Sequence, residues 1–172
     1  TPHTQIIFKV NHLGFSHSYG KFTGYEGTIN FDEADPKNSS VDITIKADSV
    51  DLNDQKWNDH LKNADFLEVE KFPTITFKST SIEVTGVKTA NITGDLTIKG
   101  VTKPVVLAAV LNGTGKHPFS GKTGAGFAAT TTIKRSDFGV NYGLPAVADE
   151  VVIALEVESY KEDAATDGAD NQ

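Results

Sequence analysis

Histidines and serines are the side chains of this sequence that could support nucleophilic chemistry. His12 and His17 flank a loop that contains Gly14, Ser16 and Ser18, and a histidine beside a serine hydroxyl can activate it as a nucleophile. No glycine-flanked nucleophile elbow follows a predicted strand, as a serine hydrolase of that kind would require. A polar loop explains the segment better, and a histidine-dependent hydrolase is kept as the least favoured function.

The other polar residues do not form a metal or acid–base site by their spacing. The histidines lack the paired spacing on a helix that a zinc enzyme needs, and the chain has no cysteine to supply a thiolate or a disulfide. Four aspartates gather near one predicted helix, where a solvated, helix-capping surface explains them better than a glycosidase pair: Asp48, Asp51, Asp54 and Asp59. We expect no catalysis, no metal and no cofactor.

Two lysines beside a predicted turn could receive a ligand. Lys99 and Lys103 lie on either side of Gly100 and Val101, where they could bind an anionic head group or form the charged end of a hairpin. Because turn residues are commonly exposed, the hairpin is the favoured interpretation.

Alternation of apolar and polar residues predicts that most of the chain is β-strand. Val41, Ile43 and Ile45 alternate with Asp42 and Thr44, which places one face in a core and the other in water. The pattern recurs in residues 6–10, 22–31, 75–84, 92–98, 105–111, 127–133 and 151–157. About eight strands without intervening helices favour an antiparallel sandwich or a closed barrel, and the pattern does not choose between them.

One helix is predicted, at residues 53–64, with Asp54 as its N-cap and Trp57, Leu61 and Ala64 on one stripe. A second, short helical turn is expected at residues 135–138. The connection 137–149 is long for a compact sheet protein, and long loops often serve as lids.

Residues 105–111 are apolar on both faces of their predicted strand, and residues 151–155 are nearly so. Both faces should therefore be covered, either by the helix or by a second copy of the chain. A lipid-free protein–protein interaction module or stress-related binding protein is accordingly the main alternative function.

Composition limits the partners. The 172 residues fit one domain, which we expect at 1–161, followed by an acidic flexible tail at 162–172. A net charge of −7 would repel nucleic acid. The chain has no run of about 18 apolar residues that could span a membrane. It also has no methionine, as a removed signal peptide would leave it.

Several motifs resemble the YceI family in their order and spacing over nearly the whole chain before the tail. They are His12-Leu13-Gly14, Gly20-Lys21-Phe22, Ala64-Asp65-Phe66-Leu67 through Phe72-Pro73, Thr76-Phe77-Lys78-Ser79-Thr80, the stretch from Gly94 to Val105, Gly126-Phe127, and Arg135 to Val140. The chain departs from the family at Phe119, where tryptophan is common, and at Thr123-Gly124, where an arginine often stands.

The resemblance implies an all-β fold, an eight-stranded antiparallel lipocalin-like β-barrel. It also implies a periplasmic or secreted location and a long-chain isoprenoid-type lipid, polyprenyl or quinone, that is sequestered or transported without catalysis. A homodimer and transient membrane contact are further expectations. Strand alternation then assigns a tunnel lining of Phe8, Val10, Phe22, Tyr25, Ile43, Phe77, Leu96, Leu107 and Phe127, and a lid of Phe15, Leu61, Phe66, Phe138 and Tyr142.

Overall fold

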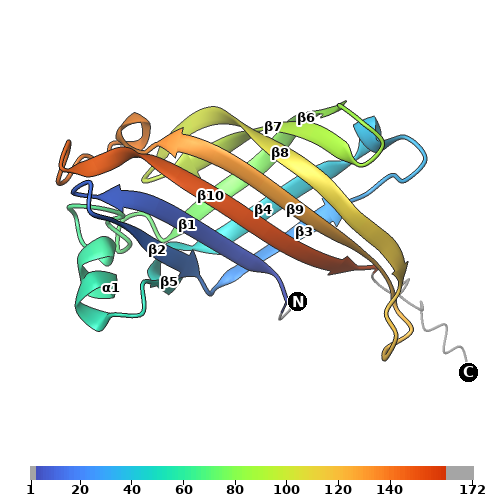
Figure 1. The fold of residues 1–172 in the computed structure, drawn as a ribbon, viewed down its shortest axis with the longest axis horizontal. Helices are drawn as coiled ribbons and strands as arrows, with labels where there is room; N and C mark the ends of the chain where they lie inside the picture. Colours follow the sequence, from blue (N-terminus) through green and yellow to red (C-terminus); the bar gives the residue numbers. More distant parts are fainter. Residues whose placement is uncertain (1–2, 162–172) are drawn as a thin grey trace, which may run out of the picture.

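The alternating segments form β-strands in the computed structural model, which describes residues 3–161 (Figure 1). The strands are β1 (Gln5–His12), β2 (Ser16–Phe22), β3 (Tyr25–Asn30), β4 (Ser40–Lys46), β5 (Val50–Asp51), β6 (Thr74–Val84), β7 (Thr89–Ile98), β8 (Val101–Lys116), β9 (Thr123–Lys134) and β10 (Val147–Tyr160). The helical segments are α1 (Gln55–Lys62) and three short 3-10 turns, η1 (Pro36–Asn38), η2 (Ala47–Ser49) and η3 (Arg135–Phe138). The tail predicted at 162–172 lies outside the described residues.

The predicted eight-stranded closed barrel is wrong. Ten antiparallel strands form one sheet in the order β3-β4-β6-β7-β8-β9-β10-β1-β2-β5, and the sheet curls into a half-barrel (Figure 1). Most of β2 escaped prediction because Ser16, Ser18 and Gly20 give it no apolar alternation, and β5 has two residues. The all-β class is confirmed, and residues 3–161 contain one α-helix, within the predicted range.

Two short corners connect consecutive strands of the sheet. Thr23 and Gly24 separate β2 from β3, and η2 separates β4 from β5. The corners are held together by backbone hydrogen bonds, from Thr23 N to Ser49 O (3.1 Å) and from Lys46 N to Gly24 O (2.8 Å). The bends let the same chain segments follow the curvature of the sheet.

The β7–β8 connection is a tight hairpin, as favoured from the sequence. Lys99 and Gly100 both have positive φ, at 51° and 75°, as a two-residue hairpin turn of the primed type requires. The Lys99 ammonium donates to Ala64 O (2.9 Å) and lies 3.8 Å from a Glu68 carboxylate oxygen. Lys99 thus ties the hairpin to the loop that follows α1.

β8 pairs with β7 from Val101 onward but with β9 only from Ala108 onward. Pro104 lies in the stretch that has a strand neighbour on one side, where a residue without an N–H is tolerated. η3 contacts β8 here, and its Phe138 side chain is 2% exposed. The 3-10 turn expected at 135–138 therefore packs into the core.

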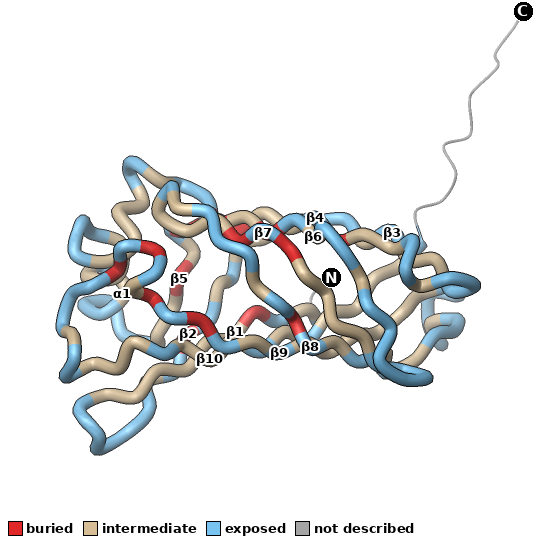
Figure 2. The backbone as a smooth tube through the Cα atoms, turned by 90° about the horizontal axis from the view of Figure 1, so that it is seen from above, coloured by how far each residue is buried: buried red, intermediate tan, exposed pale blue. Residues whose placement is uncertain are grey.

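The core is the inner face of the curled sheet. Its buried residues lie in strands from both ends of the sequence, as the buried parts of the tube in Figure 2 show. They are Ile6, Val41, Ile45, Ala47, Ile75, Phe77, Leu96, Leu107, Ile133 and Phe138.

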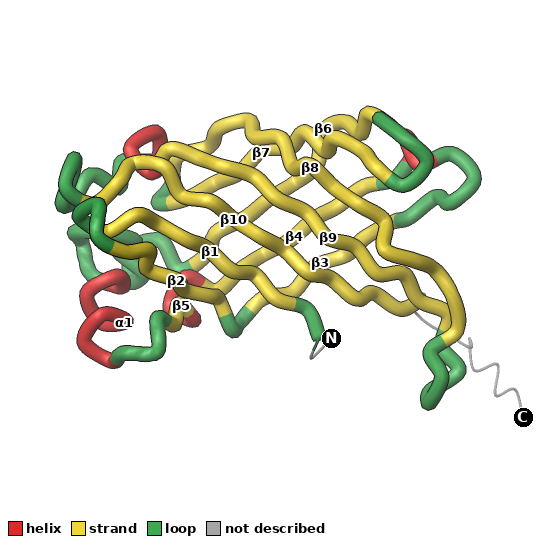
Figure 3. The backbone as a smooth tube through the Cα atoms, viewed as in Figure 1, coloured by secondary structure: helices red, strands yellow, loops and turns green. Residues whose placement is uncertain are grey.

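α1 lies at one end of the sheet beside the β1–β2 turn, not against the outer face of β8 (Figure 3). On that outer face Val106 is 49% exposed and Val110 is 40% exposed. Of the covers expected for the outer face of this strand, the helix is therefore not the one, because α1 caps the end of the sheet; a second copy of the chain stays a prediction. No helix among residues 3–161 is long and apolar enough to cross a bilayer.

Candidate functional site

A cavity of about 390 Å³ lies inside the curled sheet, within the range of roughly 300–1,000 Å³ found for small-molecule pockets. Its wall is almost entirely apolar. The contributing strands run through the whole sheet, with Ile6 on β1, Ile75 on β6, Leu96 on β7 and Leu155 on β10 among the lining residues. Such a wall favours an apolar guest and offers it few hydrogen-bond partners.

Strand register explains how the wall is built. Ile133, Val151, Val10 and Ser18 face one another across β9, β10, β1 and β2. The next inward row contains Thr131, Ile153, Phe8 and Gly20. Because side chains alternate along a strand, the side chains of these two rows face the cavity.

Two glycines make room for aromatic rings in the wall. A Cβ added at Gly20 would overlap the ring of Phe8, and one added at Gly94 would overlap the ring of Phe77. Phe8 also packs against Phe22, with ring centroids 5.7 Å apart. The glycines let these rings lie flat along the sheet and leave the centre of the cavity open.

Polar side chains of the lining concentrate at the end where α1 lies. This end, which we call the mouth, is formed by the end of β1, α1 and the loops 63–72 and 139–146. Its polar lining groups are His12, Trp57, His60, Arg135 and Tyr142. Among residues 3–161, no aspartate or glutamate lines the cavity.

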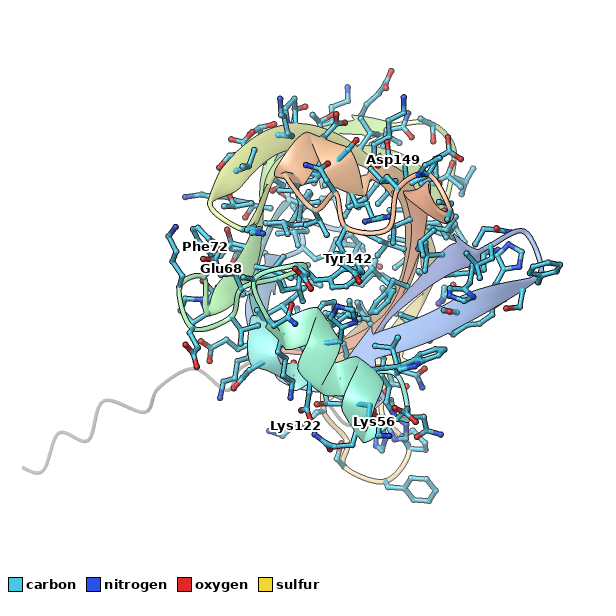
Figure 4. The ribbon with its side chains drawn as sticks, turned by 90° about the vertical axis from the view of Figure 1, so that its left-hand side faces the viewer. Lys56, Glu68, Phe72, Lys122, Tyr142 and Asp149 are labelled. Carbon is cyan, nitrogen blue, oxygen red and sulfur yellow. The ribbon has the colours of Figure 1, made fainter. Side chains whose placement is uncertain are left out.

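Three aromatic rings meet across the mouth. His60 on α1 lies 4.9 Å from Phe66 and 5.0 Å from Tyr142, and Phe66 lies 5.3 Å from Tyr142, all between ring centroids. His60 Nε2 is 3.1 Å from an Asp65 carboxylate oxygen. Tyr142 lies near the middle of this end when the molecule is viewed along the sheet (Figure 4). Three separate segments therefore cover the mouth through one aromatic cluster.

Arg135 fixes the loop that carries Tyr142. Its guanidinium is buried and donates four hydrogen bonds of 2.8–2.9 Å, to the carbonyl oxygens of Val140, Tyr142, Val147 and Ala148. Burial lowers the pKa of Arg135, and the charge of Asp149 opposes that change.

Asp149 holds the other side of the same loop. Its carboxylate accepts hydrogen bonds from Ser136 N (2.8 Å) and Ser136 Oγ (2.7 Å). These two bonds, with a smaller contribution from the Arg135 charge, lower the pKa of Asp149. The connection expected at 137–149 is shorter in the structure, because η3 extends to Phe138 and β10 begins at Val147. Arg135 and Asp149 hold its two ends.

The structure brings most of the predicted tunnel residues to the cavity. Seven line it: Phe8, Val10, Phe22, Ile43, Phe77, Leu96 and Leu107. Tyr25 does not, and its hydroxyl donates to Thr4 O. Phe127 does not either, because it packs edge-on against Phe31 with ring centroids 5.3 Å apart. Contact of any of these residues with a lipid stays a prediction.

Four of the five predicted lid residues also line the cavity, and one does not. Leu61, Phe66, Phe138 and Tyr142 lie at the mouth end of the lining. Phe15, at the β1–β2 turn, is 90% exposed and lies outside the cavity.

Several lining residues were missed by sequence reasoning. Ile6 shares strand parity with Phe8 and Val10, so alternation could have found it. Alternation did not predict Arg135 as a lining residue, because a charged residue after a strand usually faces solvent.

The catalytic alternative finds little support in the geometry. His12 faces the cavity, with its ring centroid 6.3 Å from that of Trp57, whereas His17 is exposed. Within residues 3–161 no serine hydroxyl hydrogen-bonds to a histidine ring, and no group of three or more histidine, aspartate or glutamate side chains could hold a metal ion.

A curled antiparallel sheet around an apolar cavity defines a lipocalin-like class of protein. Residues 1–159 match the model of the YceI-like domain, and the chain belongs to the YceI-like family. It is 45% identical over 160 residues to a UPF0312 protein of Ectopseudomonas mendocina, covering 93% of this chain and 83% of that one.

Solved structures show the same fold. The YCEI protein of Campylobacter jejuni superposes with a TM-score of 0.82 at 34% identity, covering 90% of this chain and 91% of that one. BcnA of Burkholderia cenocepacia superposes with a TM-score of 0.83 at 28% identity, over 91% and 96%. A polyisoprenoid binding domain from Saccharophagus degradans, implicated in plant cell wall breakdown, superposes at 0.71 with 12% identity, over 93% and 94%, which shows a shared fold.

Proposed function

We propose that this protein binds an apolar lipid inside the curled sheet and catalyses no reaction. The observation that carries the proposal is the cavity of about 390 Å³ with its almost wholly apolar wall. The polyisoprenoid binding of a structural neighbour supports the same class of ligand. Sequestration or transport of the lipid and a periplasmic or secreted location stay predictions from the family resemblance.

The distribution of polar groups orients the guest. The head group lies at the mouth, beside His60, Arg135 and Tyr142, and the chain extends inward along Phe8, Ile153 and Leu155. A cationic head is disfavoured because no carboxylate of the described residues lines the cavity. A neutral or weakly acidic head on a long isoprenoid or quinone-type chain fits this arrangement.

The preference for lipids of a given chain length should follow from the volume of the cavity rather than from contact energy. Burying forty carbons at about 0.8 kcal/mol each would release roughly 30 kcal/mol, beyond the roughly 20 kcal/mol at which measured affinities saturate. Ordering of the chain and of the mouth must offset much of this. Guests are then selected by whether they fit.

A paired substitution on β10 tests the proposal. Ile153 lines the cavity, and its neighbour Ala154 is exposed on the outer face. Ile153→Trp should fill the cavity and abolish lipid that co-purifies or is added, whereas Ala154→Trp should leave lipid binding unchanged. Native mass spectrometry of folded protein, followed by organic extraction and lipid mass analysis, measures both.

Undiminished lipid binding by folded Ile153→Trp protein would contradict the cavity as the site. Wild-type protein that carries no lipid and refuses added polyprenyl or quinone lipids would instead favour an interaction module. The exposed Val106 and Val110 on the outer face of β8 are the observation that supports this second candidate, and a second copy of the chain is one partner that could cover them.

A further inference from the structure

The mouth of the cavity carries apolar side chains that face outward. At the β1–β2 turn Leu13 is 48% exposed and Phe15 is 90% exposed; Trp57 on α1 is 49% exposed and Tyr142 is 50% exposed. We call these four side chains the rim. Trp57 and Tyr142 also line the cavity, so the rim continues the cavity wall to the surface.

Contacts between three segments make the rim one surface. The rings of His12 and Trp57 lie 6.3 Å apart and join the β1–β2 turn to α1. Leu13 N donates to Ala146 O (3.0 Å) and joins the same turn to the loop 139–146. His60 and Tyr142, 5.0 Å apart, join that loop to α1. The turn, the helix and the loop also lie together at one end of the fold (Figure 1).

Two of the three rim segments are uncharged. Residues 12–18 and 139–147 contain no aspartate, glutamate, lysine or arginine, in a chain of which 23% is charged. Segments without charged side chains leave water at a much lower cost than charged ones. The third segment, α1 with the loop that follows it, has no excess of positive charge. Its residues 54–71 carry five acidic and three basic side chains.

We propose that the rim docks on the surface of a zwitterionic lipid bilayer. Leu13 and Phe15 insert among the acyl chains, and Trp57 and Tyr142 lie at the level of the head groups, where such amphipathic rings are favoured. The cavity then opens directly onto the bilayer, so that an apolar chain moves between them without crossing water. This use of the rim rests on the proposed lipid binding, although docking itself does not need a loaded cavity.

The acidic character of the chain selects the type of bilayer. With a net charge of −7, the protein gains no long-range attraction to anionic lipids. Binding should therefore be driven by apolar insertion and respond weakly to salt.

Trp57 is the single tryptophan of the chain and reports on docking directly. Purified full-length protein is mixed with phosphatidylcholine vesicles, and binding is measured by flotation and by the emission of Trp57. We expect co-flotation and a blue shift that 0.5 M salt leaves largely unchanged. The double variant Leu13→Ser, Phe15→Ser should bind at least tenfold more weakly.

Phe119→Ser is the matched control, because Phe119 is 93% exposed but belongs to the β8–β9 turn at the other end of the sheet (Figure 1). It should float like the wild type. Failure of wild-type protein to float with phosphatidylcholine, equal loss in both variants, or binding that needs anionic lipid and disappears in salt would each overturn the proposal. Lipid added in detergent solution separates the two ideas, because it reaches the cavity without a bilayer: the rim variant should still bind it.

Discussion

At the scale of single residues, Arg135 is the least expected feature of the molecule. A buried guanidinium normally pairs with a carboxylate, yet this one donates to four carbonyl oxygens, two in the loop and two at the start of β10. The planar fork of donors matches several acceptors at once, which a single ammonium cannot do. The charge therefore orders backbone rather than forming an ion pair.

Arg135→Lys should lower the free energy of unfolding by about 2–4 kcal/mol, because several buried carbonyls lose their donor. Chemical denaturation followed by far-UV circular dichroism measures the change. Lys103→Ala, at an exposed position, should change stability by less than about 0.5 kcal/mol. Equal stability of the Arg135→Lys variant and the wild type would show that the loop is held by other contacts.

Asp149 gives the same loop a dependence on pH. Its pKa in the folded protein is lowered by the two hydrogen bonds from Ser136, so its stabilising contribution is fully present above the unfolded pKa of roughly 3.9. The contribution is lost as pH falls from there through the lowered folded pKa. The difference in stability between wild type and Asp149→Asn should accordingly be largest above about pH 5 and shrink in stronger acid. A stability difference that grows on acidification would contradict the predicted direction of the pH dependence.

At the scale of elements, β1, β2 and β10 show which parts of the fold the sequence could reveal. Alternation located β10 and β1 because their inward residues are large and apolar. It missed β2, whose inward positions hold Ser18 and Gly20 across from Val10 and Phe8. These two inward residues of β2 are small where the facing residues of β1 are large. This complementarity can be recognised only once the strand register is known.

The mouth was harder to predict than the wall. The helix and its Asp54 cap were predicted, and Asp54 accepts from Trp57 N (3.0 Å). Tyr142 contacts His60 and Phe66 across a sequence separation of more than 70 residues. No local pattern brings such residues together, so Phe15 was expected in the lid and His60 was not.

The complementarity of β1 and β2 can be tested at Gly20. Gly20→Ala should push the ring of Phe8 into the cavity, lower stability by about 1–2 kcal/mol and reduce bound lipid by more than half. Gly113→Ala, where an added Cβ meets nothing within 4 Å, serves as the control. Extraction and quantification of lipid from both folded variants gives the comparison, and full lipid content in Gly20→Ala would contradict the flat position of the ring.

At the scale of the whole molecule, the sheet encloses space that a guest should fill. A ligand that binds only the folded state stabilises it by about 2.7 kcal/mol when its concentration is a hundred times its dissociation constant. Removal of lipid from the purified protein should therefore lower its melting temperature by roughly 5–10 °C. Differential scanning calorimetry before and after delipidation measures this, and added lipid should restore the value. Identical melting curves would indicate an empty or rigid cavity.

The position of β1 between β2 and β10 also has a kinetic consequence. β1 is paired along most of its length with β10, so the sheet cannot assemble until the ribosome has made almost all of the described chain. Pairing across such a long sequence separation slows folding, typically to milliseconds or seconds. During that interval apolar strands are exposed and prone to aggregate, so a chaperone has both the time and the binding surface to hold the nascent chain. A polypeptide held unfolded in this way is also one that can still be threaded through a narrow pore.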